Sequence, residues 1–161
     1  VPTSDLANVR VDEIGWGGAV VGLLLIGPSI CLMEGVPLRM QGWVVLVLAL
    51  AFSAQVAGQA LGSVALGGFL GAIAASLGAS VVEMRRPQLA RLVLFLPAFW
   101  LLVPGSLGLV GVMELAAGRQ STTDVALSVL GVAIAIALGL LVGSSLGRSL
   151  RGRLAVDLAP A

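Results

Sequence analysis

The sequence has very little charge. Only 11% of its 161 residues are charged, whereas 58% are hydrophobic, and the mean hydropathy is +1.09. A soluble domain carries about 25% charged residues and roughly 45 to 50% apolar ones. The chain therefore has too few polar side chains to cover a surface that faces water. This composition excludes an ordinary soluble domain and indicates that the natural solvent is lipid.

Histidine, lysine and paired cysteines are also missing. Without histidine or lysine, a serine nucleophile has neither a histidine base nor a lysine partner, and neither an HExxH nor a two-cysteine metal motif occurs. Cys31 is the only cysteine, so it can form no disulfide within the chain. The net charge of +1 gives no basic face for nucleic acid. We expect no enzyme, no metal or other cofactor and no nucleic-acid partner.

The charges that are present lie in short strips between five long uncharged runs. These runs comprise residues 14–33, 43–61, 64–82, 92–113 and 125–146. A helix needs roughly 20 apolar residues to cross a hydrocarbon core of about 30 Å. We therefore predict an all-α integral membrane protein with five transmembrane helices. A signal peptide fits the first run poorly, because Asp12 and Glu13 precede it instead of a basic cluster.

The arginines predict how the chain lies in the membrane, because cytoplasmic loops carry an excess of them. With five crossings, Arg10 and Arg119 share one side. The other side holds Arg39, Arg85, Arg86, Arg91, Arg148, Arg151 and Arg153. We interpret the clusters at 85–91 and 148–153 as topology determinants and headgroup anchors. If the fourth run entered the membrane and returned on the same side, the two sides would carry five and four arginines. This bias is weaker than seven against two, so a true crossing is favoured.

This count places the N-terminus outside the cell and the C-terminus in the cytoplasm. The expected location is the cytoplasmic (inner) membrane. Residues 1–13 are then an extracytoplasmic tail or a linker between two halves of a larger protein. Residues 14–147 form the five-helix transmembrane domain, and residues 148–161 form a cytoplasmic tail.

Gly62 and Ser63 alone separate the second run from the third, so the chain must turn near them. One continuous helix through both runs would overshoot the bilayer. Gln55 and Gln59 lie four residues apart and share a helix face. Amide groups in lipid need partners on other helices or on a substrate. We treat both as candidate substrate-binding residues, and hydrogen bonding between helices is the alternative.

Small residues follow each other at intervals of four in the third run, at Gly67, Gly71, Ala75 and Ala79. Helices associate in lipid through van der Waals contact, and small residues at this spacing let two backbones approach closely. We predict a helix-packing face here.

The fourth run contains Pro97 and Pro104, seven residues apart. A proline lacks the N–H donor and clashes with the carbonyl four residues earlier, so we predict a broken helix. Irregular backbone at membrane depth is tolerated where it lines a cavity, and broken helices form the substrate sites of many transporters. Trp100, between the prolines, is a candidate to line such a site. The alternative is a simple proline kink.

Pro104, Gly105 and Ser106 are the centre of this candidate site. Gly105 permits close approach of the backbone. Ser106 is suited to cap the following half-helix or to donate to a ligand near the positive end of the helix dipole. Freed carbonyls and a half-helix N-terminus together suit a zwitterion.

The stretch Leu96-Pro97 and the string LLVPGSLG at residues 101–108 resemble the signature of the threonine/serine exporter family, in its C-terminal membrane half. Arg86-Pro87 ahead of this segment and the stretch Gly139-Leu140-Leu141 before the arginine-rich tail agree with it. The resemblance covers residues 14–153.

The resemblance implies a ten-helix bacterial inner-membrane transporter made of two halves, either fused or encoded as separate subunits. Such a protein exports threonine and serine with the proton-motive force, so its partners are the N-terminal half, protons, the substrate and lipid. Two halves of five helices each lie in opposite orientation, as in inverted repeats. Without histidine, the proton carrier must be a carboxylate. Glu114, which continues the half-helix that begins at Ser106, is the candidate.

Two alternatives stay open. Related two-subunit members are associated with export of dicarboxylates such as succinate. A dianion would favour an arginine inside the membrane, and the five runs contain none, which favours an amino acid unless the other half supplies the cation. The second alternative is a structural or assembly subunit of a membrane complex that moves no solute.

Overall fold

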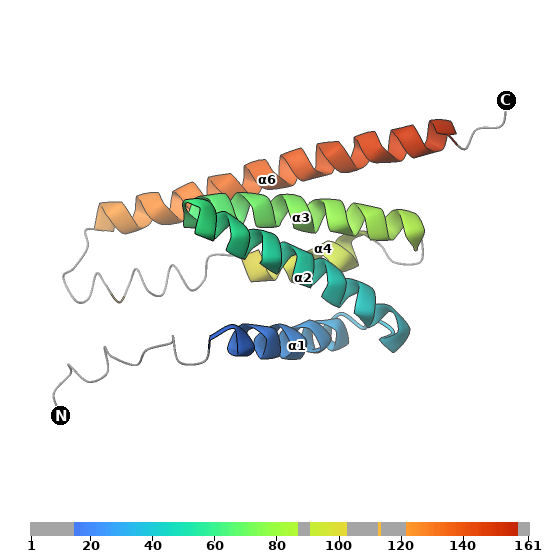
Figure 1. Cartoon of the computed structure of the whole chain (residues 1–161), viewed down its shortest axis with the longest axis horizontal. Helices are drawn as coiled ribbons and strands as arrows, with labels where there is room; N and C mark the ends of the chain where they lie inside the picture. Colours follow the sequence, from blue (N-terminus) through green and yellow to red (C-terminus); the bar gives the residue numbers. More distant parts are fainter. Residues whose placement is uncertain (1–14, 87–90, 103–112, 114–121, 158–161) are drawn as a thin grey trace.

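The computed structural model describes residues 15–86, 91–102, 113 and 122–157, and their regular secondary structure is entirely helical (Figure 1). The helices are α1 (Gly15–Met33), α2 (Leu38–Leu61), α3 (Val64–Arg85), α4 (Arg91–Leu102) and α6 (Thr122–Asp157). The predicted all-α class is confirmed for these residues, and each uncharged run contributes to one of the helices.

Three stretches are long and apolar enough to cross a membrane by length and composition: α2, α3 and residues Thr123–Gly152 of α6. Helix α4 has 12 residues and continues through Pro97 to Leu102. Helix α6 has 36 residues and extends well past Leu146, where its uncharged run ends. The first part of the predicted tail 148–161 is therefore a continuation of this helix.

The turn between α1 and α2 is closed by backbone hydrogen bonds around Gly35. The N–H of Val36 donates to the carbonyl of Cys31 at 2.8 Å, and the N–H of Gly35 donates to Leu32 at 3.2 Å. This is the Schellman pattern, which requires a left-handed residue after the helix. Gly35 supplies it with a φ of 68°, and Pro37 then precedes the first turn of α2.

The turn between α2 and α3 lies at Gly62 and Ser63, where the sequence predicted one. Ser63 caps α3, since its hydroxyl oxygen accepts a hydrogen bond from the N–H of Leu66 at 3.1 Å. A serine in this position satisfies one of the N–H groups that the first turn of a helix leaves unpaired. The chain thereby reverses direction between α2 and α3 within two residues.

Helix α3 is the centre of the bundle, with α6 along one side and α2 and α4 along the other (Figure 1). Helices α1, α3 and α6 run in one direction, and α2 and α4 run in the opposite one. The end of α3 and the start of α4 therefore lie at the same end of the bundle as the late part of α6. We call this the arginine end, because Arg39, Arg85, Arg86, Arg91, Arg148 and Arg151 all belong to the helix segments that meet there.

The buried core follows the seams around α3 and is made largely of small or β-branched residues. Its members include Val44, Val47, Leu48 and Ala51 of α2, Ala72, Ala75 and Ala79 of α3, and Leu94, Ala98 and Leu102 of α4. Close packing of small side chains brings the helix backbones near one another, as expected of helices that associate in lipid.

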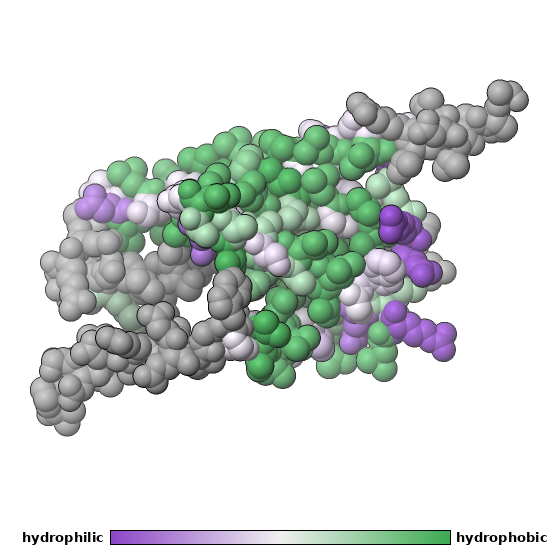
Figure 2. Space-filling model, in the orientation of Figure 1, coloured by the Kyte–Doolittle hydropathy of each residue, from purple (hydrophilic) through white to green (hydrophobic). Residues whose placement is uncertain are grey.

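Most large apolar side chains lie on the outside instead. On α6, Leu127, Leu130, Ile134, Leu138 and Leu141 form a stripe along one helix face, and each is more than half exposed. Figure 2 shows the body of the bundle as predominantly hydrophobic, with hydrophilic residues gathered toward its ends. A monomeric soluble protein rarely exposes a contiguous apolar surface of this extent.

Candidate functional site

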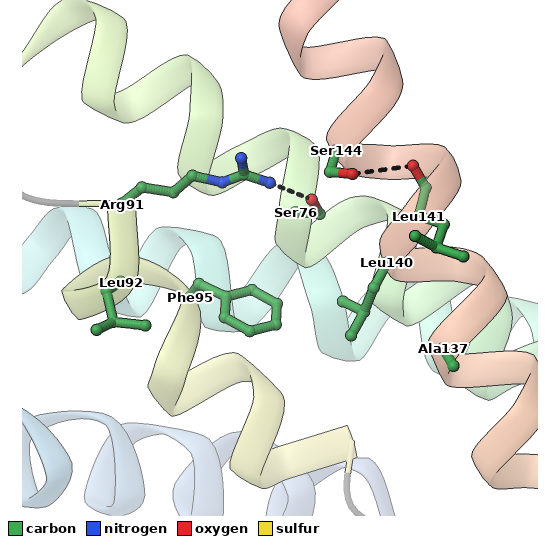
Figure 3. Close-up of a pocket in the computed structure, with 8 residues that line it drawn as sticks. All are labelled: Ser76, Arg91, Leu92, Phe95, Ala137, Leu140, Leu141 and Ser144. Atoms are coloured by element: carbon green, nitrogen blue, oxygen red, sulfur yellow. Dashed lines mark hydrogen bonds between the residues drawn. The ribbon is translucent and has the colours of Figure 1, made fainter.

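A groove of about 700 Å³ lies between α3, α4 and α6, and we call it the α3–α4–α6 groove (Figure 3). It is lined by Ser76 of α3, by Arg91, Leu92 and Phe95 of α4, and by Ala137, Leu140, Leu141 and Ser144 of α6. Five of these residues are apolar. The three polar ones come from three different helices, so the groove combines an apolar wall with a small polar patch.

Arg91 supplies the one ionisable side chain among the residues that line the groove. It is the first residue of α4, and Figure 3 shows its side chain extended from α4 toward α3. Its Nη2 donates a hydrogen bond to the Oγ of Ser76 at 2.8 Å. Ser76 is only 1% exposed. The guanidinium is therefore turned into the bundle and held at a buried hydroxyl.

Serine hydroxyls beside the groove donate to backbone carbonyls of their own helices. The hydroxyl of Ser80 donates to the backbone carbonyl of Ser76 at 2.8 Å, which lies one turn earlier on α3. Across the groove, the Oγ of Ser144 donates to the carbonyl of Leu141 at 3.0 Å (Figure 3). Such bonds keep a hydroxyl satisfied in an apolar setting and leave its oxygen able to accept a further donor.

Glycines at intervals of four bring α6 against the serine face of α3. A Cβ atom added to Gly143 would lie 2.8 Å from the Cβ of Ser76, and one added to Gly147 would lie 2.6 Å from the Oγ of Ser80. A Cβ at Gly139 would lie 2.8 Å from the Cβ of Ala72. These distances leave no room for a larger side chain. The α3–α6 seam therefore depends on glycine at all three positions.

A neighbouring face of α3 makes a second close seam, with α2. A Cβ atom at Gly67 would lie 2.6 Å from the carbonyl oxygen of Gln55, and one at Gly71 would lie 3.2 Å from that of Ala51. Ala75, the third residue of the predicted packing face, has no exposed surface. The small residues of α3 thus lie on two neighbouring faces, each against a different helix.

Gln55 and Gln59, predicted as substrate-binding residues, lie at this α2–α3 seam and not in the α3–α4–α6 groove. Gln55 is half-buried and Gln59 is exposed. A Cβ atom at Gly67 would lie 2.6 Å from the Cγ of Gln59, so the aliphatic part of this side chain packs on α3.

The residues predicted around the prolines are separated by the structure. Pro97 is fully buried in the core, whereas Trp100, on the same helix, is 61% exposed. Neither lines the groove. Pro104, Gly105, Ser106 and the predicted proton carrier Glu114 lie outside the described residues.

Two other arginines at the arginine end make contacts near the surface. Arg151 of α6 forms an ion pair with Glu83 of α3, and the guanidinium of Arg86 lies 5.7 Å from the ring centroid of Trp43. These are the contacts expected of anchoring arginines. Arg91 differs from them, since its side chain enters the bundle.

Sequence reasoning missed the groove, because its three polar residues lie far apart along the chain and Arg91 was grouped with the anchors. Two signals were available. Ser76 and Ser144 are hydroxyl residues inside uncharged runs, and Gly139, Gly143 and Gly147 repeat at the spacing of a close-packing face.

Among the described residues, no group of three or more metal-ligating side chains comes together. Comparisons with known protein families, with curated proteins and with solved structures found no match to this chain.

Proposed function

We propose that the chain is a multi-pass membrane protein that forms one half of a secondary transporter. In this proposal it exports small amino acids such as threonine and serine across the cytoplasmic membrane with the proton-motive force, together with an N-terminal membrane half. Two observations support the proposal: the resemblance of residues 101–108 to the threonine/serine exporter family and the architecture of the bundle.

The apolar exterior supports the membrane part of this proposal. Three helices have the length and composition of membrane spans, and the large side chains of α6 face outward instead of into the core. Burying these side chains in lipid would remove them from water, at a gain of about 25 cal/mol per Å² of apolar surface. In water the same surface would drive aggregation.

The distribution of arginines supports the orientation. The described arginines belong to helix segments that meet at one end of the bundle (Figure 1), and the cytoplasmic side of membrane proteins is the side rich in arginine. Helix α3 ends at the arginine end and α6 starts at the opposite end, so the chain between them passes from one end to the other. This path favours a fourth crossing over a re-entrant segment.

The observation that carries the transport proposal is the contact of Arg91 with Ser76 inside an otherwise apolar groove. An ionisable side chain within a membrane bundle is costly, and such residues mark substrate or ion pathways. The glycine seams join α3 to α6 and to α2, so in a purely structural subunit this bond would serve only to hold α4 against α3.

The same contact favours the dicarboxylate exporter as the second candidate. The uncharged runs contain no arginine, but Arg91 borders the fourth run and its guanidinium reaches the groove. The absence of a cation inside the runs therefore no longer disfavours a dianion such as succinate.

Efflux from membrane vesicles tests the proposal. Vesicles that contain the chain with its other half are loaded with radiolabelled threonine or succinate, and loss of label is followed with and without a proton gradient. Ala137→Trp fills the groove, whereas Ala133→Trp adds the same bulk one turn away on α6, at an exposed position outside the groove.

We expect gradient-dependent loss of one of the two solutes, abolished by Ala137→Trp and retained in Ala133→Trp. If neither solute moves in vesicles that hold the folded, assembled pair, the exporter proposal is wrong and the structural subunit becomes the better explanation. If the two variants behave alike, the groove is not on the path.

A further inference from the structure

The Arg91 guanidinium lies at an unusual depth along the bundle. Its partner Ser76 precedes Arg85, the last residue of α3, by nine residues. At a rise of about 1.5 Å per residue this is about 13 Å along the helix axis. A hydrocarbon core is about 30 Å thick, so Ser76 lies near the middle of the predicted span. Arg91 thus carries a positive charge from the arginine end toward the bilayer centre.

Among the described residues, no ion pair is formed by Arg91, and Glu83, the carboxylate of α3, pairs with Arg151. A guanidinium has five N–H donors, and the bond to Ser76 uses one. The Ser76 oxygen accepts that bond, which leaves its own O–H free to donate. The polar patch therefore offers several hydrogen-bond donors and a positive charge to the groove.

We propose that Arg91, with Ser76, binds the carboxylate group of a small organic acid in the α3–α4–α6 groove. The inference rests on the proposed function, because it assigns this groove to the transport path. A carboxylate offers two acceptor oxygens that match the planar fork of a guanidinium, and the ionised bonds are among the stronger ones in proteins. The rest of the solute lies along the apolar wall formed by Phe95, Leu140 and Leu141.

The depth of the patch selects a solute over a lipid headgroup. Phosphates of lipids lie at the interface, at the level of Arg85 and Arg86, where exposed arginines already serve as anchors. Ser76 lies about 13 Å deeper, where a headgroup would have to leave its own layer. A small acid that enters the bundle from one side reaches this depth without such a displacement.

Equilibrium binding tests the site directly. The chain, assembled with its other half in nanodiscs of zwitterionic lipid, is titrated with radiolabelled threonine and succinate. Threoninol, which has an alcohol in place of the carboxylate of threonine, competes as the matched ligand control. The variants are Arg91→Gln, which removes the charge, Arg91→Lys, which keeps the charge without the fork, and Arg39→Gln, which removes an exposed arginine at the same end.

We expect an acid to bind, threoninol to compete poorly, and Arg91→Gln to weaken binding by about tenfold or more, as for a charge-assisted hydrogen bond. Arg91→Lys should bind with intermediate affinity, and Arg39→Gln should match the unmodified protein. If Arg91→Gln does not fold, the affinity of Arg91→Lys relative to that of the unmodified protein tests whether Arg91 takes part in binding.

Three results would overturn the site. Equal binding by Arg91→Lys, Arg91→Gln and the unmodified protein would remove Arg91 from recognition. Equal competition by threoninol would show that the carboxylate is not what is bound. Competition by added phosphatidylglycerol, with no binding of either acid, would assign the patch to anionic lipid.

Efflux measured on the same variants separates this inference from the proposed function. Gradient-driven efflux that persists unchanged in Arg91→Gln leaves the exporter proposal standing and rejects the site. Acid binding that depends on Arg91, without gradient-driven efflux in any assembled preparation, supports the site and rejects the exporter.

Discussion

Gly143 allows α6 to approach the buried serine on which Arg91 is held. A Cβ atom at this position would overlap the Cβ of Ser76, at 2.8 Å. At Gly131, on the same helix, an added Cβ meets nothing within 4 Å. The two glycines therefore separate a packing requirement from the general effect of glycine on a helix.

Gly143→Ala should destabilise the bundle by about 1–3 kcal/mol, because an overpacked contact forces the helices apart. Gly131→Ala should cause no loss, since alanine is the better helix former by about 1 kcal/mol. Unfolding by SDS in mixed micelles, followed by circular dichroism, measures both. Equal stability of the two variants would contradict the α3–α6 seam.

The ion pair between Glu83 and Arg151 ties the same two helices at the arginine end, but it lies in a more exposed setting. The Arg151 side chain is 57% exposed and that of Glu83 is 28% exposed. Exposed pairs of this kind contribute about 0–1 kcal/mol, because water screens the charges and two long side chains must be ordered.

A double-mutant cycle with Glu83→Gln and Arg151→Gln should therefore give a coupling energy below about 1 kcal/mol. Unfolding in the same micelles measures it, and Glu83→Gln paired with Arg148→Gln is the matched control, with no coupling expected. A coupling of several kcal/mol would show that the pair is buried in the assembled protein.

Among the elements, the turn between α2 and α3 depends on one side chain. Ser63 precedes the first residue of α3 and accepts from the N–H of Leu66. Ser53, inside α2, donates only to the carbonyl of Ala49 in its own helix. The Ser63 cap satisfies a backbone N–H that has no partner within the helix. The Ser53 bond goes to a carbonyl inside a continuous helix, so it satisfies no unpaired backbone group.

Ser63→Ala should lower the stability of the bundle by about 1 kcal/mol, and Ser63→Asp should retain it, since aspartate is an equally good cap. Ser53→Ala is the control and should stay near the unmodified protein. Thermal unfolding in detergent detects the difference. A Ser63→Ala protein as stable as the control would mean that water caps α3 instead.

The all-helical class was predictable from the sequence, because uncharged runs of about 20 residues are typical of membrane helices. Among the described residues, three helices have the length and composition of a membrane span, and α4, with 12 residues, is shorter than its uncharged run. The reversal at Gly62 and Ser63 followed from the same reasoning, since one helix through both runs is too long for a bilayer. The length of α6 beyond Leu146 was missed, because charged residues end an apolar run without ending a helix.

The groove was harder to predict than the helices. Arg91 lies at the border of a run, where an arginine usually anchors a helix in the headgroups, and nothing local shows that its side chain turns inward. That direction depends on Ser76, 15 residues earlier on another helix. Contacts between helices follow from packing, which a single sequence specifies only through patterns such as the glycines of α6.

The whole molecule has one end rich in arginine and an apolar body, and every functional proposal depends on its lying across a membrane in that orientation. Figure 1 places the α1–α2 turn at the arginine end and the α2–α3 turn at the opposite end. Native Cys31 has no exposed surface, so it should stay unlabelled by maleimides and serve as a silent background. Exposed positions at the two ends can then carry single introduced cysteines.

The most direct measurement is the sidedness of maleimide labelling in intact cells, with Glu34→Cys and Arg148→Cys at the arginine end and Leu61→Cys and Thr123→Cys at the other. We expect a membrane-impermeant maleimide to label the second pair from outside and to reach the first pair only after the membrane is opened. Labelling of Glu34→Cys and Leu61→Cys from the same side, or of all four without opening the membrane, would contradict a membrane-spanning bundle with a cytoplasmic arginine end.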